Sequence, residues 1–347
     1  MKKVSVVILN WNGVEMLQKF LPKVMEYSKG EEVEICVADN GSTDESVTWL
    51  EAHCPEVRLI ILDKNYGFAD GYNKALLQVE AEYVVLLNSD VEVTPHWLDS
   101  LVAYMDAHPE VAACQPKIRA ERNRGYFEYA GAAGGYLDKY GYPFCRGRIF
   151  EIVEEDRGQY DTIQSVLWAT GAALFIRLQD YQEAGGLDGR FFAHMEEIDL
   201  CWRLRSRGRE IVCIPQSLVY HVGAATLKKE NPRKTFLNFR NNLLMLYKNL
   251  PEKDLRKVLF VRGVLDWLAT FVFFLKGDCK NARAVIQARK EFKNIRSDFA
   301  SFRAENLKRA TGKPISEKVD YSILWKFHFE RRRTYLSIMK SQGKVSS

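Results

Sequence analysis

The fold class of this chain is indicated by one stretch, Tyr83-Val84-Val85-Leu86-Leu87-Asn88-Ser89-Asp90. Five apolar residues run without interruption and stop at three small polar ones. An apolar run bounded by a turn signal is typical of a strand buried on both faces of a parallel sheet. Asn88, Ser89 and Asp90 then lie at its carboxyl end, where open α/β sheets bind ligands. A carboxylate there can hold a hard cation, although an ordinary turn is the competing interpretation.

Four further segments resemble this strand, and segments with helical spacing alternate with them. They are residues 4–9, 34–38, 57–62 and 111–114. This alternation predicts βαβ units, hence an α/β protein with a mostly parallel, Rossmann-like sheet flanked by helices. Polar residues follow the strands, so we expect Asp39, Asp44 and Asp90 to converge at one edge of the sheet. A Gly-x-Gly-x-x-Gly motif and a Walker loop are missing from the sequence, which disfavours dinucleotide and P-loop binding.

Three carboxylates cluster in the first turn of a predicted helix that begins near His194. They are Glu196, Glu197 and Asp199. Helix capping could explain them, but three acids within four residues are more than capping needs. Glu196 and Asp199 share a helix face, whereas Glu197 points elsewhere. One carboxylate could therefore act in a cleft while another is held by Arg203 or a backbone amide.

Two other segments carry weaker signals. A lone histidine is usually structural, but His221 ends an apolar run, 218–221, which is where a site residue would lie. Residues 125–158 interleave aromatic rings with glycines, which predicts loops and short strands over the sheet edge. Such rings could stack on sugar faces, and a plain β-hairpin insertion is the alternative.

Composition is that of a globular protein of 347 residues. The seven scattered cysteines form no Cys-x-x-Cys pair, which favours a reducing compartment over a disulfide framework or a zinc knuckle. Residues 1–3 lead directly into a strand that is too short and too polar for a signal peptide. We therefore expect a cytoplasmic protein, with peripheral attachment to the cytoplasmic face of the inner membrane left open.

The basic residues concentrate near the carboxyl end of the chain. Residues 276–347 carry 18 Lys and Arg against 7 Asp and Glu, a net charge of +11, whereas the whole chain carries +5. Because this charge is not spread across the sheet, the sequence disfavours nucleic-acid binding. Residues 255–275 are apolar but interrupted by Arg262 and Asp266. They predict a helix lying on an anionic membrane surface rather than a span, with packing against the catalytic part or a second subunit as the alternative.

Taken in order, these motifs resemble the inverting glycosyltransferases of family 2, which have the GT-A fold, and the rhamnosyltransferase-like subgroup in particular. The resemblance covers roughly residues 3–250. It implies a catalytic domain over 1–250, followed by a helical, basic extension over 251–347. It also implies that a nucleoside-diphosphate sugar, dTDP-rhamnose or a UDP-sugar, is the donor. A glycan or a lipid-linked molecule of cell-surface polysaccharide synthesis is then the acceptor. The sequence does not decide between a monomer and an oligomer.

The resemblance implies roles for the polar segments. The opening strand supplies Asn10 and Asn12, and the turn after the second strand supplies Asp39, which is implied to contact the base of the donor. Asn65 to Asn73 matches the pattern that lines the donor site, and Asn88-Ser89-Asp90 stands where the family has Asp-x-Asp. The implied donor-binding residues are Asn10, Asn12, Asp39, Asn40, Ser42, Asn65, Gly67, Phe68, Asn73, Asn88 and Ser89. Asp90 and His221 are the implied ligands of a divalent metal, Mg²⁺ or Mn²⁺.

Two positions depart from the family pattern. Asn88 replaces the first acid of Asp-x-Asp and leaves Asp90 as the main carboxylate ligand. Glu197 replaces the commoner Asp at the position of the catalytic base. We predict Glu197 as the base that takes the acceptor proton in a metal-assisted single displacement, and Glu196 and Asp199 stay open as alternatives.

A binding protein without enzymatic activity is the alternative to this enzyme. A sugar-nucleotide-binding module without catalysis would share the sheet and the donor site. It would have no need for the acids at 196–199, which favours the enzyme. A nucleotidyltransferase would normally carry a glycine-rich basic loop after the first strand, where this chain has Asn10-Trp11-Asn12-Gly13.

Overall fold

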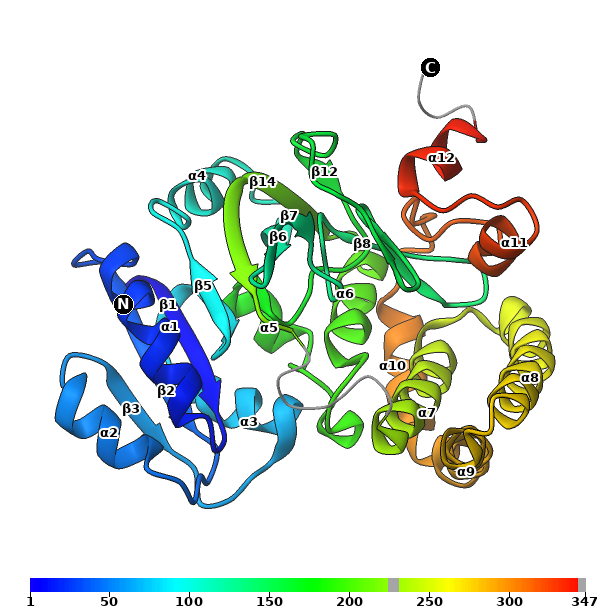
Figure 1. Cartoon of the computed structure of the whole chain (residues 1–347), viewed down its shortest axis with the longest axis horizontal. Coiled ribbons are helices and arrows are strands. Elements are labelled where there is room, and N and C mark those ends of the chain that lie inside the picture. The colour runs from blue at the N-terminus through cyan, green and yellow to red at the C-terminus, as the bar shows by residue number, and fades with distance from the viewer. Residues whose placement is uncertain (224–230, 343–347) are drawn as a thin grey trace.

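The computed structural model describes residues 1–223 and 231–342 (Figure 1). Its centre is a ten-stranded mixed sheet with the order β12-β14-β6-β13-β4-β1-β2-β3, to which β5 and β7 add at β14 and β6. The first strands pair in parallel, as the alternating pattern predicts. They are β1 (Lys2–Asn10), β2 (Val33–Asp39), β3 (Arg58–Ile61) and β4 (Ala81–Asn88).

The unbroken apolar run is explained by the two cores that β4 separates. Val84 and Leu86 belong to one buried cluster, and Val85 and Leu87 belong to the other. Because both faces of the strand are buried, no alternation of polar and apolar residues is needed. The prediction for residues 83–87 is therefore confirmed.

The second half of the sheet is mixed. β13 (Ala173–Arg177) runs antiparallel between β4 and β6 (Val111–Ala120). The apolar run at 218–221 is the end of a longer strand, β14 (Glu210–His221), which has an irregularity between Ile214 and Leu218. β12 is a short strand (Gln164–Ser165), and Trp168 after it makes an isolated bridge to Gly135. The remaining strands are β5 (Val91–Val93) and β7 (Asn123–Phe127).

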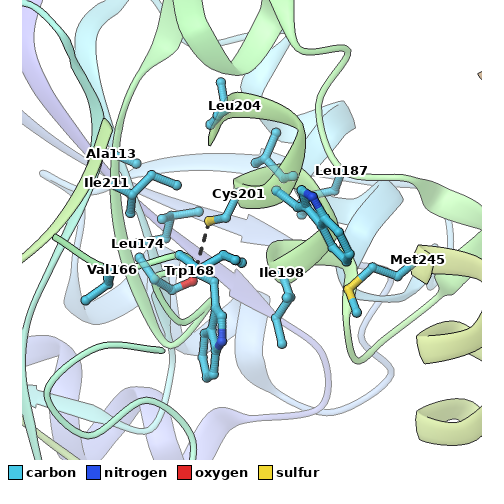
Figure 2. Close-up of a cluster of buried hydrophobic side chains, with 14 of the residues drawn as sticks. Ala113, Val166, Trp168, Leu174, Leu187, Ile198, Cys201, Leu204, Ile211 and Met245 are labelled. Carbon is cyan, nitrogen blue, oxygen red and sulfur yellow. Dashed lines mark hydrogen bonds between the residues drawn. The ribbon is translucent and has the colours of Figure 1, made fainter. Parts of the chain in front are cut away.

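Helices cover both faces of the sheet (Figure 1). They are α1 (Val14–Tyr27), α2 (Ser46–His53), α3 (Gly67–Leu76), α4 (Asp99–Ala107), α5 (Leu178–Glu183) and α6 (Glu196–Ser206), with a 3₁₀ turn, η1 (Gly189–Phe191), before α6. Side chains of α6 are buried against the sheet and against α7, and Figure 2 shows Ile198, Cys201 and Leu204 of α6 among them. Cys201 Sγ lies 3.9 Å from Ala169 O. This packing fixes the first turn of α6, which carries the acidic cluster.

The aromatic, glycine-rich stretch forms a small antiparallel sheet, as loops and short strands were expected to do. Its strands are β8 (Gly135–Leu137), β9 (Pro143–Cys145), β10 (Arg148–Ile149) and β11 (Ile152–Val153). Several of its rings do not face a ligand. Tyr136 and Phe144 are buried and stack at 5.6 Å, and Tyr335 of the extension covers them. The expected sugar-stacking wall is therefore wrong for these two rings, because the carboxyl-terminal segment covers them.

The carboxyl-terminal part is helical, as predicted. It contains α7 (Pro232–Asn249), α8 (Glu252–Leu275), α9 (Cys279–Ile295), a 3₁₀ turn η2 (Arg296–Phe299), α10 (Ala300–Arg309), α11 (Ile323–His328) and α12 (Tyr335–Lys340). One continuous buried cluster joins strands of the central sheet to residues as late as Met339. The predicted domain boundary between residues 250 and 251 stays a prediction. The two parts share this buried cluster. All seven cysteines lie in the described residues and are free.

Candidate active site at the carboxyl edge of the sheet

The ends of β1 and β2 are held together by side chains. Asn10 Nδ2 donates to Asp39 Oδ2 at 3.1 Å and to Ser42 Oγ at 3.2 Å. Asp39 Oδ1 accepts from the Ser42 backbone N–H at 2.8 Å, which closes the turn after β2. Asn10 Oδ1 is buried without a hydrogen-bond partner. The turn is thus preformed, and it presents one acceptor that a bound ligand could satisfy.

A second set of amides shapes the neighbouring turns. Asn12 Oδ1 accepts from Thr43 N at 2.7 Å. Asn40 Oδ1 accepts from Tyr66 N at 3.0 Å, and Asn40 Nδ2 donates to Gly67 O at 3.0 Å. Asn65 Oδ1 accepts from Gly67 N at 2.7 Å. Three of the predicted donor-binding residues, Asn12, Asn40 and Asn65, therefore build the loops of this edge through their own side chains.

Gly67, the first residue of α3, lies against the loop that precedes the acidic helix. Its φ is +75°, and a Cβ there would come within 2.7 Å of the Phe192 ring. Phe192 O accepts from Phe68 N at 2.9 Å and so caps α3. On the other side, Gly171 lies between Phe68 and Glu197, because a Cβ at 171 would be 2.9 Å from Phe68 Cζ and 3.9 Å from Glu197 Cβ. The donor-side loops and the acidic helix are thus neighbours.

A carboxylate–imidazole pair lies at the ends of β4 and β14. His221 Nε2 is 3.1 Å from Asp90 Oδ1 and 3.4 Å from Asn88 Nδ2. On the other side of the ring, Nδ1 lies 3.5 Å from Glu128 Oε2, without a well-aligned hydrogen bond. Burial alone would lower the pKa of His221, but interactions with Asp90 and Glu128 outweigh it and raise this pKa to about 10.

The charge of Asp90 is maintained by the same contact. Burial opposes its ionisation, but the hydrogen bond with His221 outweighs that effect and holds the pKa of Asp90 below its ordinary value. Asp90 and the Asn88 amide offer the carboxylate and neutral oxygen that Mg²⁺ and Mn²⁺ accept, and His221 would offer an imidazole nitrogen once the cation displaces its proton. Among the described residues, no group of three His, Cys, Asp or Glu side chains has the arrangement of a metal centre. The residues fit a cation that takes its remaining ligands from a substrate.

Two of the three acids of α6 have buried oxygens without a partner. These are Glu196 Oε2 and Glu197 Oε2. Burial, followed by the charge of Glu197, raises the pKa of Glu196 well above its ordinary value. Burial raises the pKa of Glu197 to about 7. A carboxylate with a pKa near neutrality and a free oxygen has the properties of a general base.

Asp199, in contrast, has partners for both of its oxygens. Its carboxylate is fully buried and bonded on both oxygens. Oδ2 contacts Arg203 Nε at 3.0 Å and Lys248 Nζ at 2.7 Å, and Oδ1 accepts from Asn249 Nδ2 at 2.8 Å. The geometry therefore disfavours Asp199 as the base, because its lone pairs are used to join α6 to α7. The expectation that Arg203 holds one acid is met by Asp199.

Asn73 also differs from the other predicted donor-binding residues. Its Oδ1 accepts from the Tyr181 hydroxyl at 2.6 Å and from Leu187 N at 3.0 Å, and its Nδ2 donates to Leu187 O at 2.8 Å. With a further bond from Nδ2 to Asp70 Oδ1 at 3.3 Å, both polar atoms of the Asn73 side chain have partners inside the protein. Contact between Asn73 and a donor is a prediction that these bonds disfavour. Ser89 stays a prediction: a Cβ added to Gly13 would lie 3.8 Å from its Oγ, which places Ser89 at the same edge.

Sequence reasoning missed the groups that hold the loop before Glu196. Phe192, His194 and Met195 all have positive φ, of 65°, 71° and 74°. Asn241 of α7 donates to Phe191 O at 3.0 Å and to the carbonyls of Ala193 and His194 at 2.8 Å each. A polar stripe on an otherwise apolar helix was the only signal available. Glu128 was missed because it looked like one acid in an aromatic loop.

A mostly parallel sheet with a carboxylate–imidazole pair and unpartnered acids at its carboxyl edge defines a GT-A glycosyltransferase architecture. The model "Glycosyl transferase family 2" matches residues 5–159, and "Glycosyl transferase family group 2" matches residues 83–273, which is more than half of the chain. The chain belongs to glycosyltransferase family 2 and is a glycosyltransferase.

Over the aligned stretches, two relatives are about a quarter identical to this chain. The O-antigen biosynthesis protein RfbC of Myxococcus xanthus is 27% identical over 227 residues, which are 64% of this chain and only 18% of RfbC. An N-acetylglucosaminyl-diphospho-decaprenol L-rhamnosyltransferase of Mycobacterium tuberculosis is 25% identical over 230 residues, covering 62% of this chain and 75% of that protein.

Solved structures support the fold. GalNAc-T7 with UDP, GalNAc and Mn²⁺ has a TM-score of 0.62 at 14% identity and covers 98% of this chain and 58% of that one. S. aureus TarS 1-349 in complex with UDP-GlcNAc has a TM-score of 0.55 at 17% identity, covering 88% and 89% of the two chains. At these identities the likeness shows the GT-A fold alone.

Proposed function

We propose that this protein transfers a sugar, with inversion, from a nucleoside-diphosphate sugar to a hydroxyl of a glycan or lipid-linked acceptor in cell-surface polysaccharide synthesis. A dTDP-rhamnose or UDP-sugar donor is in keeping with the rhamnosyltransferase relative and the UDP-bound neighbours. The observation that carries the proposal is the buried, unpartnered oxygen of Glu197 beside Phe68 and Gly171.

The nucleoside half of the donor is assigned to the edge formed by β1 and β2. Asn10, Asp39 and Ser42 form one hydrogen-bonded unit there, and Asn12, Asn40, Asn65 and Gly67 form the adjoining loops. Because these loops are already tied together, little ordering is needed when the donor binds. Asn73 supports this arrangement from below through Leu187.

The diphosphate is assigned to Asn88, Ser89 and Asp90. Asp90 and His221 would hold a divalent cation, and that cation would neutralise the negative charge that develops on the departing nucleoside diphosphate. Asn88 replaces an acid and contributes a neutral oxygen, so the site carries less negative charge than a pair of acids would. We therefore expect weak cation affinity in the free protein and a clear increase once the donor is bound.

The chemical step is assigned to Glu197. Its carboxylate takes the proton of the acceptor hydroxyl while that oxygen attacks the anomeric carbon. The bond from the anomeric carbon to the diphosphate oxygen breaks, and its electron pair leaves with the nucleoside diphosphate. Attack from the face opposite the leaving group inverts the anomeric centre. Glu196, held protonated by its raised pKa, lies next in sequence and limits the negative charge in the pocket.

Binding and turnover can be separated experimentally. Calorimetry of the full chain with UDP, dTDP and their sugars, with Mn²⁺, Mg²⁺ or EDTA, identifies the donor and its metal dependence. Glu197→Gln should keep donor affinity and lose at least a hundredfold in turnover. Asp90→Ala should weaken donor binding only when metal is present. Asp99 is exposed, so Asp99→Ala is a matched control and should leave donor affinity unchanged with and without metal.

Two results would overturn the proposal. One is that no nucleotide sugar binds with metal present. The other is that Glu197→Gln turns over at a near-normal rate, which would remove the base from this position. Retained metal-dependent transfer in Asp90→Ala would reassign residues 88–90 to an ordinary turn.

A further inference from the structure

Helix α8 has its polar side inward and its apolar side outward. The residues buried against the body of the protein are Leu255, Val258, Arg262, Asp266 and Thr270, each three or four positions from the last. The opposite stripe is exposed and apolar, with each residue between 56% and 75% exposed: Phe260, Val264, Trp267, Leu268, Phe271 and Phe274. A surface helix in water normally has the reverse orientation.

The buried polar residues fix α8 in this orientation. Arg262 Nη1 donates to Tyr140 O at 3.0 Å and contacts Asn242 Oδ1. Asp266 Oδ2 is bonded to Arg289 Nη1 of α9 at 2.5 Å, and its Oδ1 faces Arg262. Rotating the helix to bury its apolar stripe would leave these charges unpaired, which is costly in a protein interior. The buried bonds of Arg262 and Asp266 therefore keep the apolar stripe of α8 facing outward.

Basic side chains lie at both ends of the apolar stripe. Arg256 and Lys257 are exposed just before it, and Lys276 and Lys280 are exposed just after it. Arg256 is four residues before Phe260 and so shares its face of the helix. Long cationic side chains can keep their charged heads at the level of lipid phosphates while apolar neighbours enter the acyl region.

A second aromatic and basic element lies on the same side of the molecule as α8 (Figure 1). Trp325 and Phe329 of the α11 region stack at 4.4 Å and are both exposed, and residues 331–333, three exposed arginines, follow them. The segment 139–140 joins the two elements, because Lys139 N donates to Tyr321 O at 3.2 Å while Tyr140 O accepts from α8.

We propose that α8 and the α11 region together form a docking surface for an anionic lipid bilayer, with α8 lying flat in the headgroup layer. Two features of this surface favour a lipid bilayer as its occupant. The apolar stripe is rich in Trp and Phe, which favour the membrane interface. Its surroundings are cationic, which complements anionic headgroups. This inference does not depend on the donor or on the chemical step.

Other occupants fit less well. A second copy of the chain docking face to face would bring basic rims opposite each other, which disfavours association. α8 is also the one helix of the described residues that is long and apolar enough to cross a membrane. A span would pull Arg262 and Asp266 into the hydrocarbon and away from Tyr140, Asn242 and Arg289. Both alternatives are outcomes of the test below.

The test is flotation of the full chain with vesicles of phosphatidylcholine alone or with about 30% phosphatidylglycerol. We expect strong recovery with the anionic vesicles only, reduced by high salt. Trp267→Glu/Phe271→Glu should lower the partition coefficient at least tenfold. The control Leu77→Glu/Gln78→Glu adds the same two charges at exposed positions just after α3 and should leave the partition coefficient unchanged. Replacing all three arginines at 331–333 by Gln should lower it by about tenfold or more.

Thermal melting and donor binding by each variant verify that it is folded. Equal flotation of the Trp267→Glu/Phe271→Glu variant and the control would overturn the proposal. So would a dimer in light scattering that the same variant abolishes, because α8 would then be a protein interface. Resistance to alkaline carbonate extraction would indicate a span and would also overturn it.

Discussion

At the scale of single residues, Glu196 and Glu197 both have a buried oxygen without a partner, but their pKa values are raised to different extents. Burial and the nearby charge of Glu197 keep Glu196 neutral. Glu197, with a pKa of about 7, can ionise near neutral pH and still hold a proton afterwards. Asp199, two residues on, is neutralised by Arg203 and Lys248. Position within one helical turn thus decides which acid can be a base.

The first prediction concerns pH. Glu197 must be ionised to act as a base, so turnover should fall about tenfold per unit as pH drops below about 7 and level off above it. A pH profile of kcat at saturating donor measures this directly. Glu197→Gln should remove both the activity and this limb of the profile. A flat profile from pH 5.5 to 8 would contradict the assignment.

The same substitution should stabilise the protein at high pH. The folded-state pKa of Glu197 is raised, so ionising it costs stability above about pH 7 and costs nothing below its unfolded value near 4.5. The free energy of unfolding of Glu197→Gln should therefore exceed that of the parent by on the order of 2 kcal/mol at pH 8. At pH 5 the two free energies should differ little. Urea unfolding at both pH values measures this difference, and an equal gain at both would argue against it.

Replacing Asp199 should destabilise the protein, whereas replacing Glu197 should stabilise it. Asp199→Asn leaves Lys248 and Arg203 with one buried anionic partner fewer, although Lys248 keeps Asp188 at 2.7 Å. We expect a loss of about 3 kcal/mol in the free energy of unfolding. Turnover per folded molecule should fall far less than in Glu197→Gln. Normal stability combined with lost turnover would restore Asp199 as a catalytic candidate.

At the scale of elements, α7 acts as a clamp on the loop before α6. Three non-glycine residues there have positive φ, a conformation that costs free energy and persists only where surrounding contacts impose it. Asn241 supplies those contacts through three carbonyls. Arg240 adds Nη2 bonds to Arg190 O at 3.1 Å and to Phe191 O at 3.3 Å. The position of Glu197 is therefore set by a helix distant in sequence.

Removing this clamp should lower catalysis more than binding. Asn241→Ala is expected to reduce kcat by about tenfold to a hundredfold, because a small displacement of a base is sufficient for such a loss. The shape of the pH profile should stay unchanged, which separates a positioning role from a catalytic one. Asn238→Ala is the control, since within the part of the chain that the structure describes Asn238 bonds to Lys234 O on its own helix and not to the loop before α6. Equal kcat in the two variants would count against the clamp.

The elements also show which parts of the site the sequence could predict. Strand ends were predictable because an apolar run that stops at Asn88 or at Asp39 marks a sheet edge whatever lies around it. The roles of Glu128, Asn241 and Lys248 were not, because each depends on a contact across about 50 residues or more. The contacts of Asp199 were not predictable for the same reason, since its cation Lys248 comes from a helix that no local pattern connects to it.

At the scale of the whole molecule, the extension is part of the structure that supports the site. Arg303 of α10 contacts Leu250 O and Tyr247 O, and Tyr335 of α12 packs on Tyr136 at 5.3 Å. Asp138 Oδ2 accepts from Ile323 N at 2.9 Å. The small sheet β8–β11 and the end of α7 thus depend on residues beyond 300 for burial and for hydrogen bonds.

A chain ending at Leu250 should therefore fail to give a stable catalytic domain. Truncation would expose the rings of Tyr136 and Phe144 and leave the buried Asp138 carboxylate without its α11 contact. Exposing two such rings alone removes a few kcal/mol, about 3 to 6, against a typical domain stability of about 5 to 15 kcal/mol. We expect a broadened or lost thermal transition, rapid proteolysis and no donor binding. A chain ending at Gln342 is the control and should match the parent, whereas a truncated 1–250 chain that melts cooperatively and binds donor normally would establish the boundary at 250 as a true domain boundary.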